Sequence, residues 1–249
     1  MAIPSRRALE LNELKWWSNW AAARPLGKDA YVLTSRVFRE PFFNRACFLE
    51  CRAVGEHLAE AERALGRTGL ATTVTVNQSC LSSRRVLEAA GYRPSETMIV
   101  MLSSGRTMPP ESEVHVLRTS PKTLPDWVRA YLLSFYGDEA LLAAASKTVQ
   151  RLAKSRTVTL LEARLGGEVA GVLALFRSPG LIGIYCVGTV PKFRRKGVAG
   201  ALLRRSSEIA ASEGRRLALQ TLESDGVEAF YKKRGFAELY RKMLLEKQS

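Results

Sequence analysis

The chain is poor in cysteine and histidine, the two residue types that most often build zinc sites. Its 249 residues include four cysteines and two histidines. Cys47, Cys51, Cys80 and Cys186 contain no C-x-x-C pair, whereas a zinc site needs thiolates and imidazoles clustered at short spacings. We therefore expect no bound metal, and we interpret all four cysteines as reduced, partly buried thiols.

Long apolar runs are also missing. Nowhere do 18 apolar residues follow one another, and the first twenty residues lack the continuous apolar segment of a signal peptide. These absences predict a protein without a membrane partner and with a cytoplasmic location.

Acidic residues are outnumbered, since 24 Asp and Glu stand against 38 Lys and Arg, giving a net charge of +14. A field of this sign attracts any anion, including nucleic acid and phosphorylated cofactors. The segment "KWWSNW" (15–20) could stack on bases, but three tryptophans within about one and a half helical turns more often anchor a core or an interface. We therefore do not expect nucleic acid as a partner, although a basic nucleic-acid-binding protein stays open as an alternative.

Serines, a glycine and two prolines interrupt the periodic segments at "SSGRTMPPES" (103–112). This punctuation predicts two domains, residues 1–110 and 111–249. In the second domain, hydrophobic periodicity and turn residues predict the order β, α, α, β, β, β, α, β, α, β. The predicted elements lie at 113–120, 124–136, 138–155, 157–165, 169–176, 181–190, 194–213, 216–222, 225–234 and 237–246. This order indicates an α/β (α+β) fold with a mixed sheet flanked by helices.

The segment "VPKFRRKGVAG" (190–200) connects a predicted strand to a predicted helix. The first backbone N–H groups of a helix have no intrahelical acceptor, and the helix dipole places partial positive charge there. Small residues at Gly197, Ala199 and Gly200 would let a pyrophosphate approach those amides, and three basic residues precede them. Taken alone, the segment is equally compatible with an ordinary basic helix start, because the usual nucleotide-binding glycine patterns are absent.

A second motif makes the pattern specific. Arg194-x-x-Gly197-x-Ala199 follows "YCVGTVP", and "AFYKKRGF" (229–236) comes about 30 residues later. Together they resemble the GNAT superfamily of acyl-CoA N-acyltransferases. The resemblance implies two splayed parallel strands in the sheet, with acetyl-CoA as the acyl donor between them. The cofactor-binding residues that it implies are Val187, Gly188, Thr189, Arg194, Arg195, Lys196, Gly197, Val198, Ala199, Gly200, Ser224 and Tyr231. Many family members have an asparagine where Ser224 stands, so we expect a weaker cofactor contact at this position.

The resemblance also implies catalytic roles. Tyr231 stands where family members often carry a tyrosine that protonates the departing thiolate, and a phenol with a pKa of ~10 can donate a proton at neutral pH. The alternative is that Tyr231 only packs under the cofactor. Glu162 and Glu223 are candidate general bases acting through a water, although each is also explained as a surface charge or an ion-pair member. Many enzymes of the family have no dedicated base.

The N-terminal half echoes the end of the chain. Residues 69–102 repeat the strand, helix, glycine turn and strand predicted for residues 214–246, and Gly69 and Gly91 are spaced almost as Gly214 and Gly235 are. Leu87 occupies the position of the tyrosine, and no basic glycine loop comes before it. We therefore expect a tandem arrangement in which 1–110 is a degenerate, non-catalytic GNAT-like domain.

Together these patterns predict an acetyl-CoA-dependent N-acetyltransferase, an acyltransferase that transfers groups other than aminoacyl groups. Its acceptor would be the primary amine of a small molecule, peptide or protein, attacking the thioester directly. A non-catalytic acyl-CoA-binding regulator is the other alternative. The acceptor, the acyl-chain preference and the oligomeric state, monomer or dimer, stay open at this stage.

Overall fold

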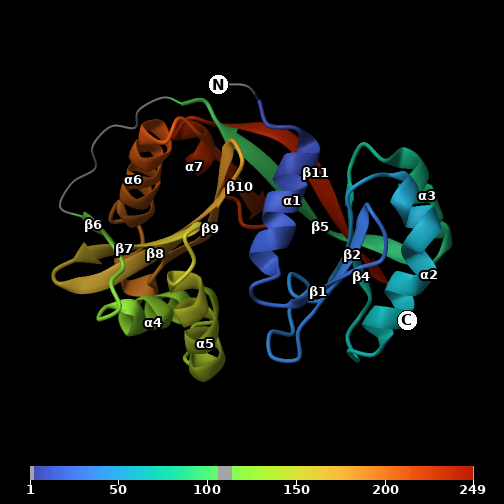
Figure 1. Ribbon diagram of the computed structural model, residues 1–249, viewed down its shortest axis with the longest axis horizontal. Coiled ribbons are helices and arrows are strands. Elements are labelled where there is room, and N and C mark those ends of the chain that lie inside the picture. The colour runs from blue at the N-terminus through green and yellow to red at the C-terminus, as the bar shows by residue number, and fades with distance from the viewer. Residues whose placement is uncertain (1–2, 106–113, 249) are drawn as a thin grey trace. The chain divides into compact units, whose positions relative to one another are not determined.

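The computed structural model describes residues 3–105 and 114–248 (Figure 1). These residues form two compact units. The C-terminal unit comprises Leu102–Leu219 and Phe230–Ala237 with residues 3–4, and the N-terminal unit comprises Ser5–Met101, Gln220–Ala229 and residues 238–248. The expected boundary at 110/111 lies outside the described residues and stays a prediction.

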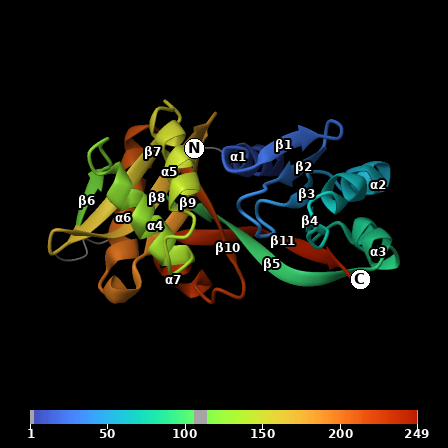
Figure 2. The ribbon, with the colours of Figure 1, turned by 90° about the horizontal axis from the view of Figure 1, so that it is seen from below.

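The C-terminal unit follows the predicted order of elements. Its strands and helices are β6 (His115–Arg118), α4 (Leu124–Phe135), α5 (Leu142–Ala153), β7 (Val158–Leu165), β8 (Glu168–Ser178), β9 (Leu181–Thr189), the short 3₁₀ helix η1 (Pro191–Phe193), α6 (Val198–Ser212), β10 (Arg216–Leu222), α7 (Glu228–Lys233) and the start of β11 (Phe236–Lys247). Its sheet runs β6-β7-β8-β9-β10. In Figure 2, α4 and α5 lie on one side of β8 and β9, and Figure 1 shows α6 on the other.

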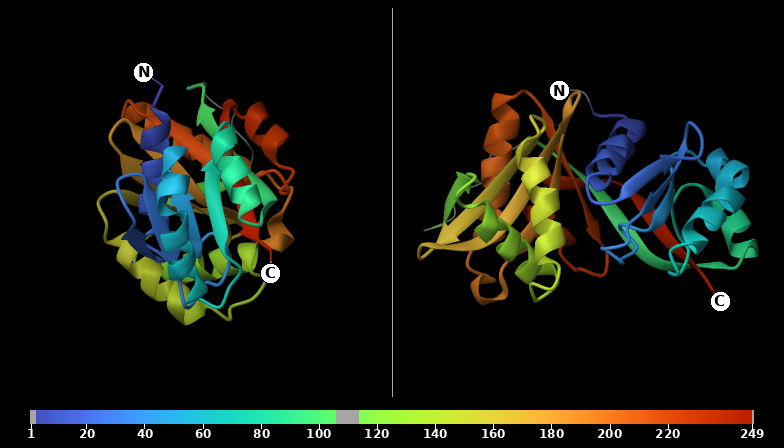
Figure 3. Two further views of the ribbon diagram at one scale, coloured as in Figure 1. Left: turned by 90° about the vertical axis from the view of Figure 1, so that its right-hand side faces the viewer. Right: turned by 60° about the horizontal axis from the view of Figure 1, so that its bottom comes forward.

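The N-terminal unit contains three helices and a sheet of its own. Its elements are α1 (Arg6–Trp17), β1 (Ala22–Pro25), β2 (Ala30–Thr34), β3 (Arg45–Phe48), α2 (Arg52–Gly66), β4 (Thr73–Asn77), α3 (Leu81–Ala89), β5 (Tyr92–Ser103) and most of β11. The strands run β1-β2-β3-β4-β11-β5. Figure 3 shows α2 and α3 lying over this sheet. Their apolar faces close a core that includes Val54, Leu65, Leu87 and Tyr92.

Both units contain the same mixed sheet. In each, three antiparallel strands are followed by a helix and by a strand that returns parallel to the third: β1-β2-β3-α2-β4 and β7-β8-β9-α6-β10. Parallel pairing joins Leu181–Ile184 to Arg216–Leu219 in one unit, but only two residue pairs in the other. The strands β3 and β9 extend beyond this pairing, which is the splayed arrangement that the sequence predicts.

The aromatic segment at 15–20 belongs to the core of the N-terminal unit. Trp16 and Trp20 are buried, and Trp20 packs edge-on against Phe38 with ring centroids 5.5 Å apart. Trp17 packs edge-on against Phe43 at 5.3 Å. These rings are engaged with each other, as the interpretation of the segment as a core anchor requires.

The expectation of four reduced cysteines is wrong for two of them. Cys51 and Cys80 form a disulfide with their Cα atoms 5.3 Å apart, whereas Cys47 and Cys186 are free thiols. The two bonded cysteines are 29 residues apart in sequence, so no short motif signals the pair. They meet because β3 and β4 run parallel and end side by side. No helix in the described part of the chain is long and apolar enough to cross a membrane.

Candidate functional site

Strand β9 contains an irregularity close to its end. Val172 of β8 pairs with Gly188, and Ala174 pairs with Tyr185, so two residues of β9 lie opposite one residue of β8. Cys186, one of these two, has a positive φ of 54°. This is a β-bulge, which leaves backbone groups outside the ladder and re-aims the strand. The bulge falls beside the three residues expected to contact the acyl donor through their backbone.

Glycines hold the surroundings of this bulge close together. A Cβ on Gly188 would lie 2.8 Å from Ser134 Cβ and 2.9 Å from Phe135 Cε2, so α4 packs directly on β9 at this point. A Cβ on Gly171 would lie 2.6 Å from the Gly188 carbonyl oxygen and 2.5 Å from Val198 Cγ1. Neither substitution leaves the packing unchanged. Sequence reasoning missed Gly171, because a glycine within a predicted strand shows no partner until the register is known.

The start of α6 has the geometry of an anion cradle. Arg195 and Gly197 both have positive φ, 63° and 79°, and Gly197 is the N-cap residue, with no side-chain cap. The first N–H to bond four residues back is that of Ala201, which donates to the Gly197 carbonyl at 3.0 Å. The three N–H groups before it in the helix therefore lack an intrahelical acceptor. Their partial positive charge fits a phosphate.

The side chains around this helix start are basic and exposed. Arg194, Arg195 and Lys196 are all exposed, while Phe193 is buried and anchors the loop. The Lys196 ammonium lies 5.6 Å from the centre of the Phe193 ring. The residues expected to bind the pyrophosphate thus form one continuous loop with its amides and cations together, and they fit an acyl-CoA by donor type and charge.

Tyr231 lies on α7 and belongs to the same unit as β9 and α6. It is buried, and its ring packs edge-on against Phe230 at 5.3 Å and Phe236 at 6.1 Å. The rigid aromatic surroundings position the phenol. They are consistent with either a proton donor or a packing residue.

Glu162 is buried within β7, with 1% of its surface exposed. Arg164 Nε donates to its Oε1 at 2.8 Å, whereas its Oε2 has no hydrogen-bond partner among the described residues. Glu162 pairs with Val172, which pairs with Gly188, so the three residues share the sheet face under α4. Two strand spacings place Glu162 roughly 10 Å from Gly188.

Glu223 and Ser224 are grouped with the N-terminal unit. The Glu223 N–H donates to the Thr97 carbonyl at 2.8 Å, and its carboxylate pairs with Arg241. The Ser224 hydroxyl donates to Glu96. The structure therefore gives Glu223 the ion-pair partner that its alternative interpretation requires, and it does not group either residue with Tyr231. In residues 3–105 and 114–248, no group of three or more His, Cys, Asp or Glu side chains could hold a metal.

Comparisons with known proteins agree with this geometry. A family model described as "Acetyltransferase (GNAT) family" matches residues 123–236. A GCN5-related N-acetyltransferase from Kribbella flavida has 15% identity and a TM-score of 0.72, over 100% of this chain and 97% of that one. A GCN5-related N-acetyltransferase from Sphaerobacter thermophilus has 18% identity and a TM-score of 0.68, over 94% and 84%. A tandem GNAT protein from the clavulanic acid biosynthesis pathway has 13% identity and a TM-score of 0.59, over 78% and 70%. At these identities the likeness concerns the fold. No curated protein sequence matches the chain.

Proposed function

Since residues 123–236 of the chain belong to the Acetyltransferase (GNAT) family, whose members use acetyl-CoA, we propose that the protein is an acetyl-CoA-dependent N-acetyltransferase acting on a primary amine. The observation that carries the proposal is the helix start at Gly197. A left-handed glycine, three N–H groups without an intrahelical acceptor and adjacent cations are the features that bind a pyrophosphate.

The chemistry assigned to the remaining residues follows from the reaction. A neutral amine attacks the thioester carbon, the thioester carbonyl accepts a hydrogen bond from the backbone near Val187, and the C–S bond breaks. Tyr231 donates its proton to the departing thiolate. Glu162 and Glu223 are the two proposed bases, each through a water. The alternative with no dedicated base is favoured for Glu162 by its burial and for Glu223 by its ion pair.

We assign the chemistry to the C-terminal unit only. In the N-terminal unit, α2 begins after Cys51 without a left-handed glycine cap, and the buried Leu87 occupies the place of the tyrosine. This pattern supports a tandem protein with a degenerate first copy.

The proposal is tested by Gly197→Ala, with Gly214→Ala as the matched control. Gly197 caps the start of α6, while Gly214 has φ of 60° just after its end, with open space around its Cβ position. Each substitution forces an L-residue into the left-handed region, which costs about 1–2 kcal/mol. Only Gly197→Ala should weaken acetyl-CoA binding, by about tenfold or more, because it reorients the cradle amides.

Calorimetric titration with acetyl-CoA measures this difference. Equal affinities in the two folded variants would remove the cradle role. Binding without turnover on any amine would favour a non-catalytic acyl-CoA-binding regulator. Nucleic-acid binding that falls steeply with salt, and that acetyl-CoA does not compete with, would favour the basic nucleic-acid-binding alternative.

A further inference from the structure

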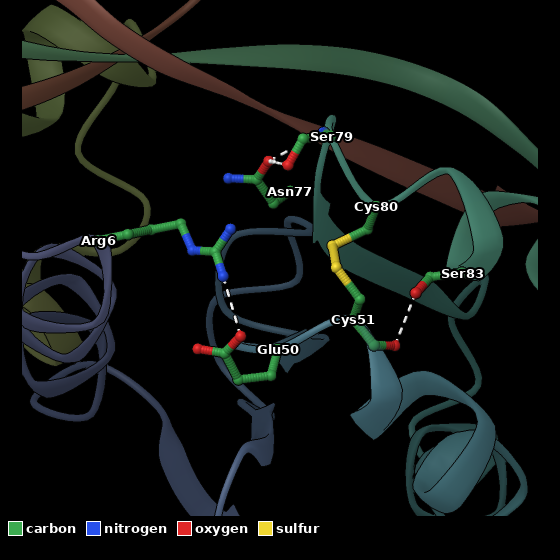
Figure 4. Close-up of a disulfide and its surroundings, with 7 residues drawn as sticks. All are labelled: Arg6, Glu50, Cys51, Asn77, Ser79, Cys80 and Ser83. Carbon is green, nitrogen blue, oxygen red and sulfur yellow. Dashed lines mark hydrogen bonds and ion pairs between the residues drawn. A yellow bond between two sulfur atoms is a disulfide. The ribbon is translucent and has the colours of Figure 1, made fainter.

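The disulfide of the N-terminal unit lies where two parallel strands give way to helices. Cys51 is the residue before α2, which follows β3, and Cys80 is the residue before α3, which follows β4 (Figure 4). The strands themselves pair at only two positions, Ala46 with Val74 and Cys47 with Thr75. The covalent bond thus closes the gap that opens between β3 and β4 beyond their last pair.

The C-terminal unit uses the corresponding junction in the opposite way. There the connection from β9 to α6 is an open, cationic loop with a glycine cap. In the N-terminal unit, the connection from β3 to α2 carries Glu50, which pairs with Arg6 at 2.9 Å, and it ends in a cysteine bonded to the neighbouring helix. A ligand that entered between the strands in one unit would meet a covalent bridge in the other.

Hydrogen bonds hold both sides of the bridge. The Ser83 hydroxyl donates to the Cys51 carbonyl oxygen at 2.6 Å, which ties the first turn of α3 to the start of α2 (Figure 4). The N–H and the hydroxyl of Ser79 both donate to Asn77 Oδ1, at 2.9 and 2.7 Å, and fix the turn before Cys80. These contacts are local to the two junctions.

Behind the bridge lies a small cavity that the same junction closes. It is walled by Leu49, two residues before Cys51, and by Cys47 and Thr75 of the last strand pair. Its volume of about 10 Å³ is the space of one water. Thr75 Oγ1 and Arg45 Nη1 are buried there without a hydrogen-bond partner among the described residues. The cavity is therefore polar, small and reachable only if its walls move.

We propose that the Cys51–Cys80 disulfide is a redox-sensitive latch: it holds the groove between β3 and β4 closed, and its reduction opens the groove and exposes Cys47. A dithiol reductant supplies two electrons and two protons, so that the S–S bond becomes two thiols and the reductant becomes a disulfide. The attack falls on Cys51, because Cys80 is the more buried of the pair. The groove stays shut in the oxidised chain. This proposal is independent of acyl transfer in the C-terminal unit.

The two remaining thiols provide the test. In the variant C51S/C80S only Cys47 and Cys186 can react with a thiol-alkylating probe, and burial raises the pKa of both thiols. We expect Cys47 to be alkylated at least tenfold faster in the variant than in the oxidised wild-type chain. Cys186, in the C-terminal unit, should react at an unchanged rate.

Three outcomes decide the proposal. A selective acceleration at Cys47, with tryptophan fluorescence still that of a folded N-terminal unit, supports the latch. An unchanged Cys47 rate overturns it. An acceleration accompanied by loss of the native fluorescence also overturns it, because the bond would then hold the whole unit rather than one groove. Should the variant fail to fold at all, reduced wild-type protein replaces it, with fragment ions distinguishing Cys47 from Cys51.

Discussion

A buried cluster of charges in the N-terminal unit allows a quantitative test of what stabilises that unit. Lys242 on β11 is 2% exposed, its ammonium donates to Glu10 Oε2 at 3.1 Å, and it also pairs with Glu13. Glu13 Oε1 in turn accepts from Arg45 Nη2 at 2.6 Å. Lys242→Met keeps most of the side-chain volume but leaves two carboxylates facing one guanidinium inside the protein.

The expected cost is large. Removing one partner of a buried ion pair destabilises a protein by about 3–5 kcal/mol, because the other charge is left uncompensated. The same substitution on the same strand provides the control: Lys247 pairs with Glu62 at 2.8 Å, but its side chain is 40% exposed. An exposed pair contributes roughly 0–1 kcal/mol, so Lys247→Met should change little.

Urea unfolding followed by tryptophan fluorescence measures both variants. Trp16, Trp17 and Trp20 lie in the N-terminal unit and only Trp127 in the other, so the signal reports mainly on the unit that carries the mutations. If Lys242→Met unfolds within about 1 kcal/mol of Lys247→Met, the buried cluster does not stabilise the unit and the reasoning fails.

The pH dependence provides a second test of the same cluster. Burial alone would raise the pKa of Glu13, but Lys242 and Arg45 hold it below its usual value of 4.5. A lowered folded-state pKa contributes stability that is present above pH 4.5 and is lost as the pH falls through the folded pKa. In Lys242→Met the carboxyl protonates more readily, so the stability difference from wild type should narrow below about pH 4.5. A constant difference from pH 7 to pH 3 would contradict this account.

Three further predictions concern single features. Tyr231→Phe should lower turnover while leaving acetyl-CoA affinity nearly unchanged; a rate equal to wild type across neutral pH would make the proton-donor role wrong. Gly188→Ala should destabilise the C-terminal unit by about 1–3 kcal/mol, because its Cβ must displace Ser134, and unchanged thermal unfolding would mean that α4 does not press on β9. Replacing Cys51 and Cys80 by serine should cost the N-terminal unit about 3.6 kcal/mol, from the closure entropy of a 29-residue loop, as measured by the same urea titration.

The order of elements in the C-terminal unit was predictable because each element carries a local signal. Alternating apolar residues identify β7, and the glycine turn at 166–167 separates it from β8. The helix predicted from residue 194 begins at Val198 instead, because a 3₁₀ turn and two residues with positive φ come first. That irregular loop is the cradle itself, so the error falls on the functional segment.

The remainder depends on contacts between distant segments. The bulge at Cys186 follows from the register of β9 against β8, which no local pattern specifies. Lys242 reads as a surface charge in a final strand, yet it is buried because Glu10 and Glu13 of α1 cover it. The disulfide likewise required the parallel approach of β3 and β4.

The last described strand has a consequence for how the protein is made. Residues 242–246 of β11 pair with residues 73–77 of β4, inside the sheet of the N-terminal unit. During synthesis, β4 leaves the ribosome long before its partner and presents an open edge until β11 has been translated. The N-terminal unit, although begun first, is therefore completed last, and its exposed strand edge needs protection from other chains in the interval.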